Sequence, residues 1–180
     1  LGAGSEIRTD ALGSIRVAGE TVSAYGSLIA PGGTIALSGG RSDAFEGSQL
    51  SAKTTVYLAP GARLSTAGTV LTQTDRFGRR VGSVLPGGTI SVSGNIVAER
   101  GAVIDVSGTS GALDAHPVAL GLDAFGNTLA PGDRLVPYMS GLTMPLYQSL
   151  ARRTTLDSAG GSIRLSGSEM LFTDATLLGH

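Results

Sequence analysis

Short segments in which apolar and polar residues alternate recur along the chain. In each of them an Ile and a Val or Leu stand two positions apart, with Ser, Ala or Arg between them. Successive side chains of an extended strand point to opposite faces, so the two aliphatic side chains share one face. The pattern predicts β-strands of about five residues, each with one buried face. Apolar residues at helical spacing are scarce.

Four of these segments share the form G-[ST]-I-x-[LV]-[SA]-G and align without gaps. They are residues 13–19, 33–39, 88–94 and 161–167. The glycines that bound each copy permit a positive φ, which we expect the chain to use at sharp corners. A longer unit is repeated as well: residues 55–68 align with residues 95–108, and each contains two short strands around a turn at Gly61 or Gly101.

The spacing of the copies predicts how the strands connect. Ile15 and Ile35 are about 20 residues apart, which is too short for a βαβ crossover but suits one turn of a coil of short strands. Stacked turns would form parallel sheets around a narrow aliphatic column. We therefore expect two inward rows of side chains in this column, the first made of Ile15, Ile35, Ile90 and Ile163 and the second of Val17, Leu37, Val92 and Leu165.

Uneven spacing predicts that extra chain leaves the coil. The intervals from Ile35 to Ile90 and from Ile90 to Ile163 are both much longer than one such turn. The first interval leaves one or two turns open, with loop insertions at 41–53 and 72–85. The second contains a long insertion at 109–159, with one short helix near 145–152, and its apolar residues predict that it packs along the outside of the coil. We treat 1–180 as a single segment of a longer polypeptide, because it begins with Leu1 rather than Met.

Composition fits a narrow coil and excludes several classes of protein. Glycine supplies 28 of 180 residues, aromatic residues are 4%, and there is no Trp. A net charge of −1 gives no broad attraction to phosphates, so nucleic-acid binding is disfavoured. Absence of Cys removes disulfides and thiolate chemistry. No apolar run approaches the ~18 residues of a transmembrane segment, and none is predicted.

The copies G-G-[ST]-I-x-[LV]-S-G at 32–39, 87–94 and 160–167, with G-A-V-I-D-V-S-G at 101–108, resemble the filamentous-haemagglutinin-like exoproteins of bacterial two-partner secretion. The resemblance covers roughly the repeat-bearing half of the chain. It implies an all-β fold, a right-handed parallel β-helix, in a longer fibre that is extracellular or on the bacterial surface. It also implies export through an outer-membrane transporter and adhesion as the usual role.

Candidate catalytic chemistry is sparse. A β-helix polysaccharide-degrading enzyme is the sharpest alternative, but it needs carboxylates that converge within roughly 5 to 10 Å. The 14 acidic residues are scattered, and Asp105 aligns with Ser65, so no acidic row is predicted. His116 has only Asp114 nearby, two residues away, and neither it nor His180 has metal-ligand spacing. We predict a protein that is not an enzyme and has no catalytic, cofactor or metal-binding residues.

Candidate partner contacts lie outside the repeats. Arg76, Arg79 and Arg80 surround Phe77, and a second basic cluster is Arg152 and Arg153. Tyr138 and Tyr147 in the long insertion are further candidates. The simpler interpretation of the arginines is a charged loop tip that aids solubility. The expected partner is a host-cell, sibling-cell or matrix surface, either glycan or protein, and an inert spacer in a surface fibre remains a third hypothesis.

Overall fold

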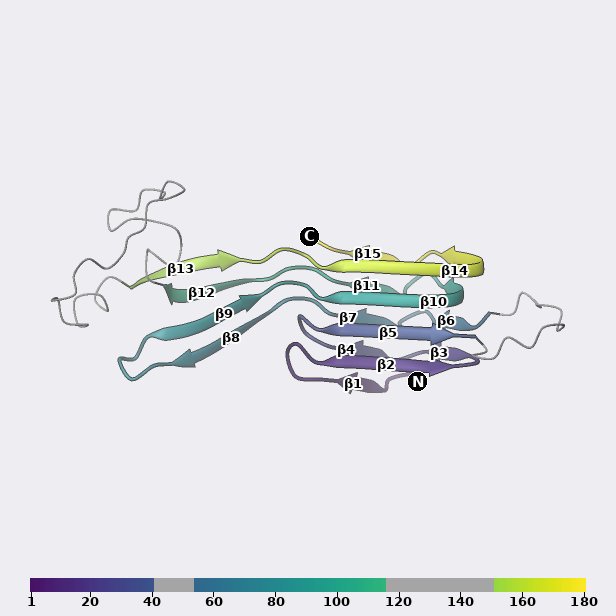
Figure 1. The fold of residues 1–180 in the computed structure, drawn as a ribbon, viewed down its shortest axis with the longest axis horizontal. Coiled ribbons are helices and arrows are strands. Elements are labelled where there is room, and N and C mark those ends of the chain that lie inside the picture. The colour runs from purple at the N-terminus through teal and green to yellow at the C-terminus, as the bar shows by residue number, and fades with distance from the viewer. Residues whose placement is uncertain (41–53, 116–150) are drawn as a thin grey trace. The chain divides into compact units, whose positions relative to one another are not determined.

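The computed structural model describes residues 1–40, 54–115 and 151–180, and these residues form an all-β fold without a helix (Figure 1). They divide into two compact units. The first, which we call the parallel unit, comprises residues 1–69, 84–109 and 157–180. The second, the hairpin unit, comprises residues 70–83 and 110–156. The hairpin unit overlaps with two of the three insertions expected from the sequence, those at 72–85 and 109–159.

Two sheets of parallel strands build the parallel unit. The first has the order β1-β4-β7-β11-β15, and all of its strands are three residues long: Glu6–Arg8, Ser27–Ile29, Arg63–Ser65, Val103–Asp105 and Thr176–Leu178. The second has the order β2-β5-β10-β6-β3, with β14 also paired to β10: Ser14–Gly19, Thr34–Gly39, Thr89–Ala98, Val56–Leu58, Val22–Ala24 and Ser162–Thr173.

The four copies of the repeat lie side by side in the second sheet. Ile35 is the register partner of both Ile15 and Ile90, and Ile90 is also paired with Ile163. The second row pairs in the same way: Val17 with Leu37, Leu37 with Val92, and Val92 with Leu165. Because Ile35 and Ile90 are direct neighbours, the interval between them is a single turn of chain. It contains β6 of this sheet and β7 of the first sheet, while most of residues 69–85 belongs to neither.

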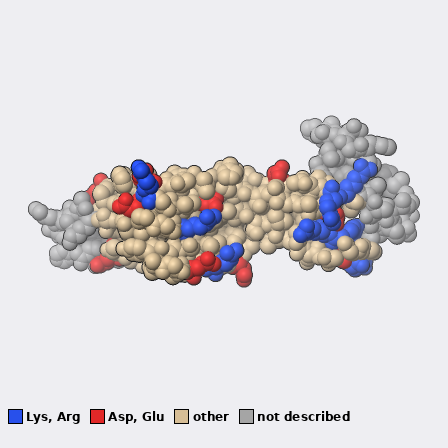
Figure 2. Space-filling model, turned by 180° about the vertical axis from the view of Figure 1, so that it is seen from behind, with Lys and Arg blue, Asp and Glu red and all other residues tan. Residues whose placement is uncertain are grey.

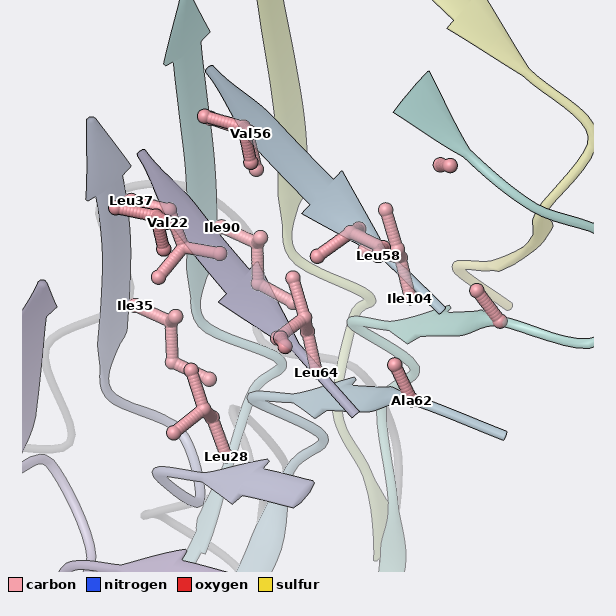
Figure 3. Close-up of a cluster of buried hydrophobic side chains, with 14 of the residues drawn as sticks. Val22, Leu28, Ile35, Leu37, Val56, Leu58, Ala62, Leu64, Ile90 and Ile104 are labelled. Carbon is pink, nitrogen blue, oxygen red and sulfur yellow. The ribbon is translucent and has the colours of Figure 1, made fainter. Parts of the chain in front are cut away.

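Aliphatic side chains from both sheets form one core (Figure 3). Ile35 and Ile90 are fully buried, while Ile163, at the edge of the sheet, is only partly buried against the cluster. The first sheet contributes a row of three side chains, Leu28, Leu64 and Ile104. The alignment of 55–68 with 95–108 matches Leu64 with Ile104, as the structure does, but no gapless copy includes Leu28. The two sheets therefore bury their side chains against each other.

In three of the four copies the first glycine is required by close packing between copies and not by its backbone angle. A Cβ atom at Gly33, Gly88 or Gly161 would collide with the backbone carbonyl of the first glycine of the adjacent copy. None of these glycines has a positive φ, so the expectation of left-handed corners at this position is wrong. That expectation does hold at the turns, where Gly61 and Gly101 have φ of 86° and 91°.

The described part of the hairpin unit consists of strands where the sequence analysis expects loops. β8 (Thr69–Thr74) pairs with β9 (Arg80–Leu85), and β12 (Ser110–Ala115) pairs with β13 (Arg152–Asp157). The arrows of each pair run in opposite directions in Figure 1. The insertion expected at 72–85 is thus a two-stranded ribbon.

Several expectations lie outside the described residues. They include the loop at 41–53, the centre of the long insertion, and Tyr138 and Tyr147. Most of the short helix expected near 145–152 lies there as well. At its described end the chain is extended, because β13 begins at Arg152.

Candidate functional site

The turn between β8 and β9 is organised by one carboxylate. Asp75 Oδ1 accepts hydrogen bonds from the backbone N–H groups of Phe77 at 2.8 Å and Arg79 at 3.0 Å. Its Oδ2 accepts from Arg79 Nε at 2.8 Å and also from Arg79 Nη2. Asp side chains stabilise turns by such bonds to the following backbone. At this turn the carboxylate also fixes one arginine of the first basic cluster.

A second carboxylate, Asp114 of β12, joins the two ribbons of the hairpin unit. Its Oδ2 accepts the backbone N–H of Arg80 at 2.7 Å. Arg153 of β13 donates to the same carboxylate through Nε at 3.0 Å and Nη2 at 3.1 Å. The Asp114 side chain is only 13% exposed. The two basic clusters, which lie far apart in the sequence, therefore meet at one carboxylate.

Both carboxylates are held in the ionised form. The hydrogen bond from the Arg79 side chain lowers the pKa of Asp75 below its ordinary value of 3.8. The side chain of Arg153 and then the backbone N–H of Arg80 lower the pKa of Asp114 in the same way. In return, Asp114 raises the pKa of Arg153. Hydrogen bonds and charge favour the charged form of each partner.

Three other arginines of this unit remain available. Arg76, Arg80 and Arg152 are exposed, and none of their guanidinium groups forms an ion pair with a described residue. The guanidinium carbons of Arg76 and Arg79 lie 4.7 and 5.0 Å from the centroid of the Phe77 ring. Phe77 is itself 51% exposed. Cation–π contacts of this kind hold the arginines at the turn.

Charge is divided between the two units. The described residues of the hairpin unit hold five arginines and two aspartates, a net side-chain charge of +3. Those of the parallel unit hold five arginines and eight acidic residues, a net of −3. In the space-filling view, blue side chains gather over the hairpin ribbons (Figure 2). The hairpin unit therefore carries a basic surface that the net charge of the whole chain conceals.

Within residues 1–40, 54–115 and 151–180, the acidic candidates are not gathered into a site. Asp105 pairs with Ser65 in register, as their alignment suggests, and both are buried. Asp105 accepts a hydrogen bond from Arg63 Nη2 at 2.8 Å and another from the backbone N–H of Ser107 at 3.1 Å, which gives it a structural role. Among the described residues, no group of three His, Asp or Glu side chains could hold a metal ion. His116 lies outside them, and His180 ends the chain.

Comparisons with known proteins give no family or neighbour. No family model, curated protein or solved structure matches this chain. In the parts of the chain that the structure describes, no helix is long and apolar enough to cross a membrane.

The arginines of this surface stand out in the sequence, but Asp114, which binds both clusters, does not. In the sequence Asp114 is notable only as a neighbour of His116. The available signal is the position of Asp114 in the short segment that opens the insertion, whose closing segment carries Arg152 and Arg153. Two such segments at the ends of one insertion are able to pair as a ribbon, and they do so as β12 and β13.

Proposed function

We propose that this chain is a non-catalytic structural and adhesive segment of a large bacterial exoprotein, extracellular or displayed on the cell surface. Its scaffold is a right-handed parallel β-helix, and its insertions carry the contacts to a host-cell, sibling-cell or matrix surface. Export through an outer-membrane transporter belongs to the same proposal, as does the absence of a bound cofactor.

The pairing of successive passes supports the β-helical scaffold. Each pass through the repeats adds a strand to both sheets, as β4 and β5 do beside β1 and β2. Later passes add β7 and β10, and then β11 and β14, after which β15 pairs with β11. Crossover connections between parallel strands of one sheet are right-handed in nearly all proteins, which supports the hand.

The observation that carries the adhesive role is the exposed arginine surface of the hairpin unit. The repeats do not need this unit, because Ile35 pairs directly with Ile90 and Ile90 with Ile163 across the insertions. Irregular or inserted segments on a regular scaffold are where proteins tend to carry their binding residues. Three exposed guanidinium groups without a carboxylate partner among the described residues give this unit the chemistry to bind an anionic surface.

Adhesion of particles coated with the chain tests the proposal. Beads carrying the whole protein should be retained under flow on at least one of three surfaces: cultured animal cells, a bacterial lawn or extracellular matrix. Beads carrying the heat-unfolded protein are the control and should wash off. Equal loss of both kinds of bead from all three surfaces would contradict the adhesive role and favour the inert spacer. Release of reducing ends from an acidic polysaccharide would instead favour the enzyme.

A further inference from the structure

We infer that the hairpin unit binds a sulfated or carboxylated polysaccharide through the guanidinium groups of Arg76, Arg80 and Arg152. This inference rests on the proposed function and names the chemical class of the partner. Arg79 and Arg153 belong to the same surface but act as positioning residues, because their charges are already paired with Asp75 and Asp114.

The ion pairs of the unit separate available arginines from committed ones. Asp114 accepts hydrogen bonds from the backbone N–H of Arg80 and from the side chain of Arg153, and so holds the start of β9 beside β13. The bond from Arg80 uses its backbone, so the guanidinium group of Arg80 is left available. Asp75 likewise fixes the turn that presents Arg76. The available guanidinium groups are thus carried on backbone that the paired residues hold in place.

The chemistry of these groups suits a linear polyanion. A guanidinium group forms paired, charge-assisted hydrogen bonds to planar or tetrahedral oxyanions such as carboxylate and sulfate. Single exposed contacts of this type are weak, but a polymer that carries an anion on each repeat engages several at once. The net charge of +3 on the described part of this unit, against −3 on the parallel unit, directs such a polymer to the hairpin unit.

Contacts of Phe77 disfavour nucleic acid and lipid. Single-stranded nucleic acid is bound by stacking bases on open aromatic faces, and Phe77 is the only aromatic residue among the described residues of this unit. Two guanidinium groups lie over its ring, so a stacked base would have to displace one of them. Insertion of the ring into a bilayer would draw the same two charges out of water.

Binding of the whole chain to immobilised polymers tests the inference. We expect binding to heparin, weaker binding to hyaluronan, which carries carboxylates but no sulfates, and none to neutral dextran. Binding should weaken steeply as salt is raised, because exposed charges are screened. Loss of binding when the heparin is desulfated, with its carboxylates kept, would identify sulfate as the main group recognised, and retained binding would identify carboxylate.

Charge-matched variants locate the site. The triple variant Arg76→Gln, Arg80→Gln, Arg152→Gln should weaken heparin binding at least about tenfold. The control removes three exposed arginines of the parallel unit, Arg8→Gln, Arg16→Gln, Arg164→Gln, and should change binding less than about threefold. Both variants should melt at the temperature of the unaltered protein, which shows that lost binding is not lost folding.

Three outcomes would overturn the inference. One is equal weakening in both triple variants, which would show a response to net charge alone. The second is binding to single-stranded DNA or to anionic phosphatidylserine vesicles in preference to either glycan. The third is no binding to any acidic polymer at low salt. If no acidic polymer binds but the coated beads still adhere, the result contradicts the acidic polysaccharide as partner and leaves the adhesive function supported. If heparin binds but the beads do not adhere, the result contradicts the adhesive function and leaves polysaccharide binding supported.

Discussion

Of the twenty buried hydrophobic residues in the described chain, nineteen lie in the parallel unit and one, Leu113, lies in the hairpin unit. The hairpin unit has instead two carboxylates, Asp75 and Asp114, each bonded to both an arginine side chain and a backbone N–H. Burial of aliphatic surface is insensitive to pH, whereas carboxylate pairs depend on it. The parallel unit is therefore stabilised mainly by aliphatic burial, and the described part of the hairpin unit by carboxylate pairs. We expect that a substitution or a change of pH can destabilise one unit without the other.

The largest effect should come from a charge placed in the aliphatic column. Ile90→Asp puts an unpaired carboxylate between Ile35 and Ile163, where no water reaches it. We expect a loss of about 4 kcal/mol or more and unfolding of the parallel unit, measured by denaturant titration. Ser91→Asp, on the opposite face of the same strand, is the control and should cost less than about 1 kcal/mol. Similar losses for both would show that this strand has no inward face.

A smaller but still large effect is expected from one methyl group. Gly88→Ala brings a Cβ against the carbonyl oxygen of Gly33 and forces adjacent copies of the repeat apart. We expect a loss of about 3 kcal/mol in the free energy of unfolding. Gly2→Ala, where a Cβ meets no atom within 4 Å, should be nearly neutral. An unchanged melting temperature for Gly88→Ala would remove close packing as the reason for this glycine.

One substitution should strengthen the parallel unit. Thr66 is fully buried and its hydroxyl has no hydrogen-bond partner among the described residues, while the residue that aligns with it in the repeat is the buried Val106. Thr66→Val keeps the shape and removes the orphan hydroxyl, so we expect a gain of about 1 kcal/mol. Thr66→Ser keeps the hydroxyl and loses the methyl group, and it should destabilise the protein. A loss of stability in Thr66→Val would show that the hydroxyl has a partner in solution.

Acid should loosen the hairpin unit alone. The pKa values of Asp75 and Asp114 are lower in the folded protein than their ordinary value of 3.8. Their pairing therefore contributes fully above about pH 4 and is lost as the pH falls through the lowered values. Protection factors of the amides in β9 and β13, which correct for the intrinsic slowing of exchange in acid, should fall as the pH drops below 3.8, before those of β5 and β10 respond. The variant Asp114→Asn should show fast exchange in β9 and β13 already at neutral pH.

A uniform acid response of both units would contradict this division. So would an Asp114→Asn variant that keeps the slow exchange of the unaltered protein, because the carboxylate would then not be what joins the ribbons.

Gapless alignment determines which strands can be predicted. Copies of G-[ST]-I-x-[LV]-[SA]-G differ only by substitution, so their pairing is evident in the sequence and is the one that the structure has. Leu64 and Ile104 are matched by the gapless alignment of 55–68 with 95–108, but Leu28, which lies beside Leu64, is missed for a simple reason. Val22 pairs with Val56 and Leu28 pairs with Leu64, yet the chain from Val22 to Leu28 is shorter than the chain from Val56 to Leu64. An alignment without gaps that matches the first pair therefore cannot match the second.

Only part of the candidate surface can be predicted from the sequence, because its two arginine clusters are distant along the chain. Arg76 to Arg80 and Arg152 to Arg153 stand out as clusters, yet their union depends on Asp114, which lies in neither. Net charge is also misleading. A total of −1 suggests no basic face, whereas the described units carry +3 and −3. Sums over a chain cannot show how charges are distributed once it folds.

The central claim is that the parallel unit is the scaffold and the hairpin unit is the binding surface. Hydrogen exchange of the whole protein, with and without heparin, tests this claim most directly. The account predicts that amides of β5, β6 and β10 exchange slowest and are unaffected by the polymer. It predicts that amides of the turn at 75–80 and of Arg152 and Arg153 exchange faster and slow markedly when heparin is added. Protection by heparin that appears in the parallel unit, or in no part of the chain, would contradict it.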